Sequence, residues 1–93
     1  MALKKVCKAF GNPERVRLVA CLTREATVET LLRKCNLSQS ALSQHLAILR
    51  DARAVQTRRE GRNIYYKTAS PHVGRLARMV IDLSNQKTTY EKY

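Results

Sequence analysis

Apolar side chains recur every three or four residues along the first half of the chain, the spacing that places them on one face of a helix. The first such stretch predicts a helix over residues 2–10. Gly11-Asn12-Pro13 then ends this helix and starts another, because Asn12 suits the capping position and Pro13 the first helical position. We expect the second helix to run to about Thr23.

Two further helices are predicted with only a short turn between them. Thr27 is the expected cap of the third helix, which ends near Cys35. Ser38 is the expected cap of the fourth, the helix of residues 38–50. Its apolar stripe, spaced i, i+4 and i+7, consists of Leu42, Leu46 and Leu49. Helices joined by so short a turn form a helix-turn-helix unit.

The apolar pattern then changes from helical to extended spacing. Residues 55–59 and 63–68 are enriched in β-branched and aromatic side chains and are predicted as strands. Glu60-Gly61-Arg62 lies between them and supplies the glycine that a tight hairpin turn requires. Ser70-Pro71 repeats the cap-and-proline signal, so a last helix is expected from there to about Gln86.

The predicted fold class is mainly α with a small β-hairpin, a winged helix-turn-helix of about five helices plus a two-stranded wing. At 93 residues the chain supports one such domain, with residues 87–93 as a frayed polar tail. A domain of this size has a modest core. We therefore expect some of its apolar surface to be buried against a partner subunit.

The charge balance favours nucleic acid as a partner. The chain has 18 Lys and Arg residues against 7 Asp and Glu, a net charge of +11 at pH 7. Double-stranded DNA carries dense phosphate charge, so a basic protein gains affinity by releasing counterions. The alternative is a basic surface with no specific partner.

Membrane association is not expected. No apolar run approaches the ~20 residues that a spanning helix needs, and the start of the chain lacks the apolar core of a secretory signal. We expect a cytoplasmic, prokaryotic protein. Three cysteines, an odd number at wide spacing, argue against a disulfide scaffold.

The helix over residues 38–50 carries small uncharged polar groups opposite its apolar stripe. An ordinary solvated face would be rich in Glu and Lys, whereas short donors and acceptors on a slim helix suit base edges in a major groove. For His45, which borders the stripe, a structural hydrogen bond is the alternative to a phosphate contact. The candidate DNA contacts of this helix are Ser38, Gln39, Ser40, Ser43, Gln44, His45 and Arg50.

The hairpin is the second candidate element. Arginines gathered at a projecting tip can reach phosphates or enter a narrow minor groove. The alternative is a solvated turn whose charges maintain solubility or discourage pairing at the sheet edge. The candidate contacts in this basic wing, residues 56–66, are Arg58, Arg59, Arg62 and Asn63.

This order of elements resembles the winged-helix repressors of the ArsR/SmtB family. The resemblance covers roughly residues 5–84, and its specific motifs lie at 8–18, 37–46 and 61–66. It implies a homodimer formed by the first and last helices, with two recognition helices in successive major grooves of a roughly palindromic operator. The wide apolar surface of the last helix independently favours a dimer.

The resemblance does not extend to the metal sites of the family. The positions of its cysteine-pair motif fall here on Thr27 and Glu29, and a lone carboxylate is a poor ligand for a soft metal. Of the ligand positions on the last helix, only His72 is in register. We expect no metal site and no cofactor.

Cys21 resembles the first reactive cysteine of the redox-sensing branch of the family. The second would fall near Asn85, so that dithiol is incomplete, although Cys7 is a substitute partner if the first two helices pack together. The alternative is that all three cysteines, Cys35 included, are small buried hydrophobic residues. A reactive thiol requires exposure and a basic neighbourhood, which a sequence does not show.

The function predicted from these features is that of a dimeric, sequence-specific DNA-binding transcriptional regulator, a repressor of a palindromic operator. Two alternatives are a winged-helix protein-interaction module without gene control and a thiol-responsive repressor that uses Cys21. RNA binding is less favoured because the chain has one Phe and no Trp to stack on bases. Catalysis is not expected, since no glycine-rich phosphate loop and no acid–base pair is evident.

Overall fold

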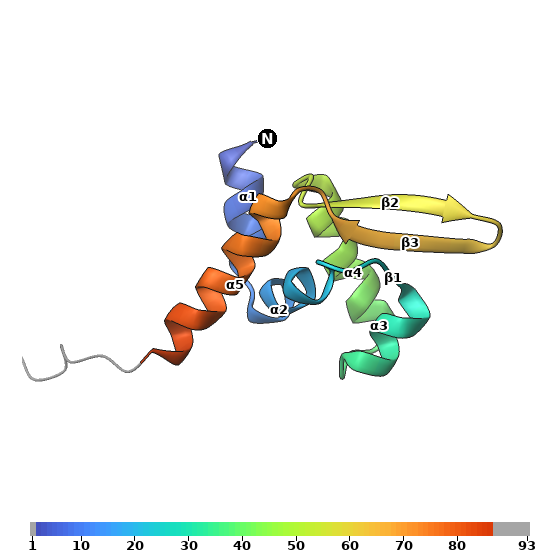
Figure 1. Ribbon diagram of the computed structural model, residues 1–93, viewed down its shortest axis with the longest axis horizontal. Coiled ribbons are helices and arrows are strands. Elements are labelled where there is room, and N and C mark those ends of the chain that lie inside the picture. Colours follow the sequence, from blue (N-terminus) through green and yellow to red (C-terminus); the bar gives the residue numbers. More distant parts are fainter. Residues whose placement is uncertain (1, 87–93) are drawn as a thin grey trace, which may run out of the picture.

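The computed structural model describes residues 2–86, and the tail expected to fray at 87–93 lies outside these residues. Figure 1 shows a group of helices from which one long hairpin projects, with α1 and α5 at the end away from the hairpin tip. In chain order the elements are α1 (Leu3–Phe10), α2 (Pro13–Cys21), β1 (Ala26–Thr27), α3 (Val28–Lys34), α4 (Gln39–Asp51), β2 (Val55–Glu60), β3 (Asn63–Thr68) and α5 (Pro71–Asn85).

Three helices begin at the capping residues that the sequence predicts. The side-chain oxygens of Asn12, Thr27 and Ser38 each accept a hydrogen bond from the backbone N–H three residues further on, at 3.1 to 3.2 Å. Ser70 also occupies the capping position before Pro71, but its side chain makes no capping hydrogen bond. These local signals confirm the predicted starts of α2, α3, α4 and α5.

The sheet has three strands where the sequence predicted two. β1 pairs antiparallel with β3, with Ala26 opposite Tyr66 and Thr27 opposite Tyr65, so the strand order is β1-β3-β2. A strand of two residues has no periodic pattern to detect, which is why it was missed. It attaches the base of the hairpin to the segment that leads into α3.

The hairpin turn is as predicted. β2 and β3 pair from Val55 opposite Thr68 to Glu60 opposite Asn63, which leaves two residues in the turn. Gly61 has a φ of 62°, in the left-handed region that glycine adopts without steric cost.

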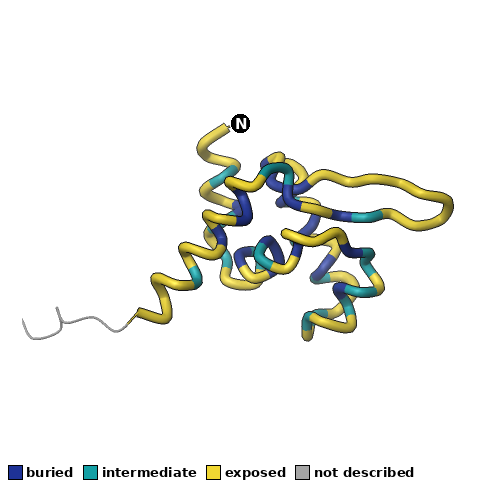
Figure 2. Tube along the Cα trace, viewed as in Figure 1, coloured by how far each residue is buried: buried dark blue, intermediate teal, exposed yellow. Residues whose placement is uncertain are grey.

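The core lies between α2, α3, α4 and the start of α5. The predicted stripe of α4, Leu42, Leu46 and Leu49, is buried, as are Val73 and Ala77 of α5. Figure 2 shows that the hairpin, by contrast, is exposed along most of its length. Because one side of α4 is fixed in the core, its opposite side is presented to solvent in a defined orientation. None of the helices within residues 2–86 is long and apolar enough to cross a lipid bilayer.

Candidate nucleic-acid interface

The uncharged polar residues of α4 lie together on its exposed side. Gln39, Ser40, Ser43 and Gln44 are exposed, and Arg50 is exposed in the last turn of the helix. None of these side chains makes a hydrogen bond that ties it to another part of residues 2–86. They are therefore available to a ligand that lies along α4.

Ser38 and His45 are more constrained than the other α4 candidates. The Ser38 hydroxyl accepts the hydrogen bond that caps α4, and its own proton stays available. His45 is half-buried, and its Nδ1 lies 3.3 Å from Nη1 of Arg15. A guanidinium is only a donor, so Nδ1 of His45 accepts and a neutral ring carries its proton on Nε2. The structural hydrogen bond considered for His45 is thus present.

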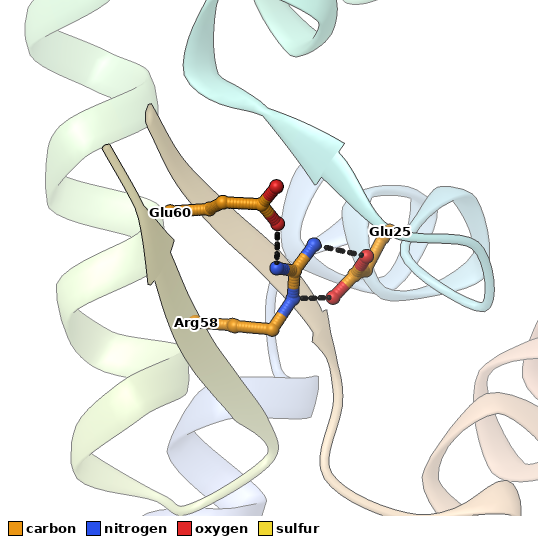
Figure 3. A network of polar contacts seen from close by, with 3 residues as sticks. All are labelled: Glu25, Arg58 and Glu60. Atoms are coloured by element: carbon orange, nitrogen blue, oxygen red, sulfur yellow. Dashed lines mark hydrogen bonds and ion pairs between the residues drawn. The ribbon is translucent and has the colours of Figure 1, made fainter. Parts of the chain in front are cut away.

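The wing arginines are not equivalent. Arg59 and Arg62 are exposed and make no ion pair with any residue from 2 to 86, and Asn63 is exposed beside them. Arg58 is instead engaged with two carboxylates (Figure 3). Its Nε and Nη2 donate to the two oxygens of Glu25, at 2.9 and 3.0 Å, and its Nη1 donates to Glu60.

The Arg58 side chain also lies over an aromatic ring, with its guanidinium carbon 4.6 Å from the centre of Tyr65. The hydrogen bond from Arg58 holds the pKa of Glu25 below its usual value, and the carboxylates of Glu25 and Glu60 raise the pKa of Arg58. Glu25 and Arg58 therefore both stay charged near neutral pH. In the free protein the Arg58 guanidinium is therefore neutralised locally, which was not anticipated when it was grouped with the other wing arginines.

Sequence reasoning missed both carboxylates of this network. Glu60 could have been found, because it is two residues from Arg58 on one strand and so lies on the same face of the sheet. Glu25 could not, because it reaches Arg58 only through the pairing of β1 with β3. Its 33-residue separation from Arg58 leaves no local signal.

The exposure of the cysteines differs from the expectation that all three are buried. Cys7 and Cys21 are exposed, so the interpretation that all three cysteines are buried is wrong for these two. Cys35 is half-buried, and burial together with the adjacent Cys21 raises the pKa of its thiol. Cys35 thus lies close enough to Cys21 for the Cys21 thiol to affect its pKa, a pairing that the sequence analysis did not consider. Within residues 2–86 no three His, Cys, Asp or Glu side chains gather where they could share a metal ion.

Comparison with known proteins identifies the family. A sequence profile described as a helix-turn-helix domain matches residues 10–58. The chain is 45% identical over 75 residues to a protein named transcriptional repressor SmtB homolog from Synechocystis, an alignment that covers 80% of this chain and 57% of that protein. The chain therefore spans somewhat more than half the length of this curated relative.

Solved structures resemble this chain in both fold and sequence. HlyU from Vibrio cholerae superposes with a TM-score of 0.77 at 36% identity, over 89% of this chain and 91% of that one. A homodimeric winged helix-turn-helix DNA-binding domain from Mycobacterium bovis gives a TM-score of 0.78 at 28% identity, over 89% and 78% of the two chains. This chain belongs to the ArsR/SmtB family of winged helix-turn-helix transcriptional regulators.

Proposed function

We propose that this protein is a homodimeric, sequence-specific DNA-binding repressor that occupies a roughly palindromic operator. The observation that carries the proposal is the exposed face of α4, which is uncharged, polar and unpaired, on a chain with a net charge of +11. General phosphate attraction requires only the positive charge. A neutral hydrogen-bonding face on the helix-turn-helix unit is the part that base edges would use.

In this proposal α4 lies in the major groove and reads bases. Gln39 and Gln44 have amide groups that can bind adenine through two hydrogen bonds, while the hydroxyls of Ser40 and Ser43 can donate to or accept from a base edge. The rigid attachment of α4 through its buried stripe supports this role, because a base-reading helix has to hold its register on the duplex.

The hairpin tip supplies contacts to the DNA backbone. Arg59 and Arg62 have free guanidiniums on a projecting turn, with Asn63 beside them. Such groups can bind phosphates or enter the adjacent minor groove. The guanidinium of Arg58 is paired with the carboxylates of Glu25 and Glu60. Arg58 therefore contributes to DNA binding through its position in the wing and not through a free charge.

The dimer interface is proposed on α1 and α5. Four apolar side chains of α5 are exposed, among them Met79 at 67% and Leu83 at 69%, and Leu3 of α1 is 77% exposed. A patch of this kind on a small domain favours burial against another subunit. A second copy is the natural occupant, because the M. bovis structure with this fold is a homodimeric domain. Two-fold symmetry would then present two α4 helices to two half-sites.

A binding experiment tests the proposal. The full chain is used to select duplexes from a random library, and its affinity for the selected duplex is compared with that for a shuffled duplex of equal length and composition. We expect a preference of about a thousandfold or more, with a two-fold symmetric selected site and weak competition by RNA. Equal affinity for the two duplexes would rule out sequence-specific binding and favour the protein-interaction module.

A thiol response is the second candidate, and the position of Cys21 favours it. Cys21 is exposed and lies next to Cys35, which precedes the turn into α4. Hydrogen peroxide could take two electrons and two protons from the pair, forming one disulfide and two water molecules. Peroxide treatment should then weaken DNA binding reversibly in wild type and in Cys7→Ser, but not in Cys21→Ser. Unchanged binding in wild type would exclude this response.

A further inference from the structure

The hairpin has little backbone support beyond its base. Within residues 2–86, β1 pairs with only Tyr65 and Tyr66 of β3, and from Ile64 to the turn the two hairpin strands pair only with each other. Figure 1 shows this outer part extending away from the helices. Two strands alone form a marginal unit in water, so the direction of the tip depends on whatever side chains brace it.

Arg58 braces the hairpin at the level where β1 ends. It lies opposite Tyr65 on β3, and Tyr65 lies opposite Thr27 on β1. Because β3 is the central strand, the Arg58 side chain has to cross it, over the Tyr65 ring, to reach Glu25 just before β1. The contact therefore joins the outer strand of the wing to the segment between α2 and α3 (Figure 3).

The geometry of this contact restricts rotation as well as distance. Two parallel N–H···O bonds between a guanidinium and a carboxylate set the angle between the two planar groups, which a single contact does not. The bond from Arg58 to Glu60 and the stacking on Tyr65 hold the same guanidinium from two other sides. A network of this kind is the case in which a partly exposed ion pair has a measurable effect.

We propose that Glu25 is a positioning residue for DNA binding: through Arg58 it fixes the angle between the hairpin and the helices, and so determines where the free arginines at the tip meet the DNA backbone. The inference rests on the proposed DNA-binding function. We call the contact between Glu25 and Arg58 the wing clamp.

Bulk electrostatics and the wing clamp predict different results for Glu25→Gln, because only the wing clamp predicts a change in the ratio of affinities for the selected and shuffled duplexes. Removing a negative charge from a DNA-binding protein should tighten its binding to any duplex. If the clamp positions the wing, the same change should weaken binding to the selected duplex relative to the shuffled one, because only on the selected duplex does α4 hold one register in which the tip arginines have to meet the backbone. Arg58→Lys separates the two effects further, because it keeps the net charge and removes the two-bond geometry.

The test measures the ratio of affinities for the selected and shuffled duplexes at one salt concentration. We expect Glu25→Gln and Arg58→Lys each to lower this ratio by about two- to fivefold, the scale of a partly exposed ion pair. Glu29→Gln is the matched control, since Glu29 is an exposed acid of α3 without an ion pair to any of the residues 2–86. It should leave the ratio unchanged while binding both duplexes as tightly as wild type or more tightly.

A second measurement uses the free protein and does not depend on DNA. Amide ¹⁵N relaxation at Gly61 and Arg62 should report larger motion of the wing in both clamp variants than in wild type or Glu29→Gln. Wild-type relaxation at these amides in both variants would overturn the wing clamp, and so would unchanged affinity ratios. Failure of wild type to prefer any duplex would refute the proposed function. The relaxation data would still show whether the wing clamp restricts the motion of the hairpin.

Discussion

Arg15 of α2 and His45 of α4 are joined side chain to side chain, with 3.3 Å between Nη1 of Arg15 and Nδ1 of His45. The same guanidinium donates to the backbone oxygens of Lys8 and Ala9, at 2.8 and 3.0 Å. These two carbonyls belong to the last turn of α1, and the Lys8 carbonyl also accepts the backbone N–H of Gly11, at 3.3 Å. One side chain therefore connects the end of α1 to the middle of the proposed recognition helix.

Replacement of Arg15 by methionine should destabilise the fold. The change keeps most of the aliphatic stem and removes the three contacts, and it leaves the Ala9 carbonyl of α1 without its hydrogen-bond donor. We expect the free energy of unfolding to fall by about 1–2 kcal/mol in urea titrations. Arg17→Met is the control, because among the described residues Arg17 makes only an exposed ion pair with Glu14, and its replacement should cost less than about 0.5 kcal/mol. Equal effects of the two changes would contradict the connecting role of Arg15.

Gln44→Ala and Arg62→Ala should affect DNA binding in different ways. Gln44 is placed to read a base, so its loss should weaken binding to the selected duplex by about 1–3 kcal/mol and leave the shuffled duplex nearly unaffected. Arg62 is placed to bind the backbone, so its loss should weaken both duplexes and lower the slope of log affinity against log salt by about 1. Equal losses on both duplexes for Gln44→Ala would remove its base-reading role.

The proposed dimer face makes a prediction about Met79. Met79→Glu places a charge in the centre of the exposed apolar patch, so we expect the dimer to dissociate at concentrations more than about tenfold higher than for wild type. Helix content should not change, since Met79 is 67% exposed in the single chain. Sedimentation velocity measures the effect, with Arg78→Glu, on another side of α5, as control. A dimer that tolerates Met79→Glu would place the interface elsewhere.

The ion pair between Glu25 and Arg58 should make the stability of the chain depend on pH. The folded-state pKa of Glu25 lies below its usual value near 4.5, so the stabilisation is present above that value and is lost as pH falls through the folded pKa. The difference in unfolding free energy between wild type and Glu25→Gln should thus shrink on acidification. Urea titrations from neutral pH to pH ~3 measure it. In the Arg58→Gln background this pH dependence should disappear.

Local signals were sufficient for most of the fold. The capping bonds of Asn12, Thr27 and Ser38 join atoms three residues apart, so the sequence contains both partners within one window. The buried stripe of α4 follows in the same way from helical geometry. The hairpin turn was predictable from Gly61, because glycine adopts the positive φ that this turn requires. Because this stripe and the polar face opposite it come from one pattern, the orientation of the proposed recognition helix was predictable as well.

What the sequence did not predict depends on contacts between distant segments. β1 forms only because β3 returns beside it, and Glu25 meets Arg58 only once β1 is in place. The proximity of Cys21 to Cys35 also depends on a contact between distant segments, since Cys21 ends α2 and Cys35 follows α3. The residue types at these positions are compatible with several partners, and the tertiary fold selects among them.

The exposure of the three thiols predicts an order of reactivity that can be measured directly. The thiolate is the reactive form, and burial both raises the pKa of Cys35 and limits access to it, while Cys7 and Cys21 are exposed. In a short iodoacetamide pulse at neutral pH, followed by peptide mass spectrometry, we expect Cys35 to react at least about tenfold more slowly than the other two. The same pulse in urea should give similar rates at all three positions. If Cys35 reacts in the folded chain as fast as Cys21, the turn before α4 opens readily, and the proposed rigid presentation of α4 is contradicted.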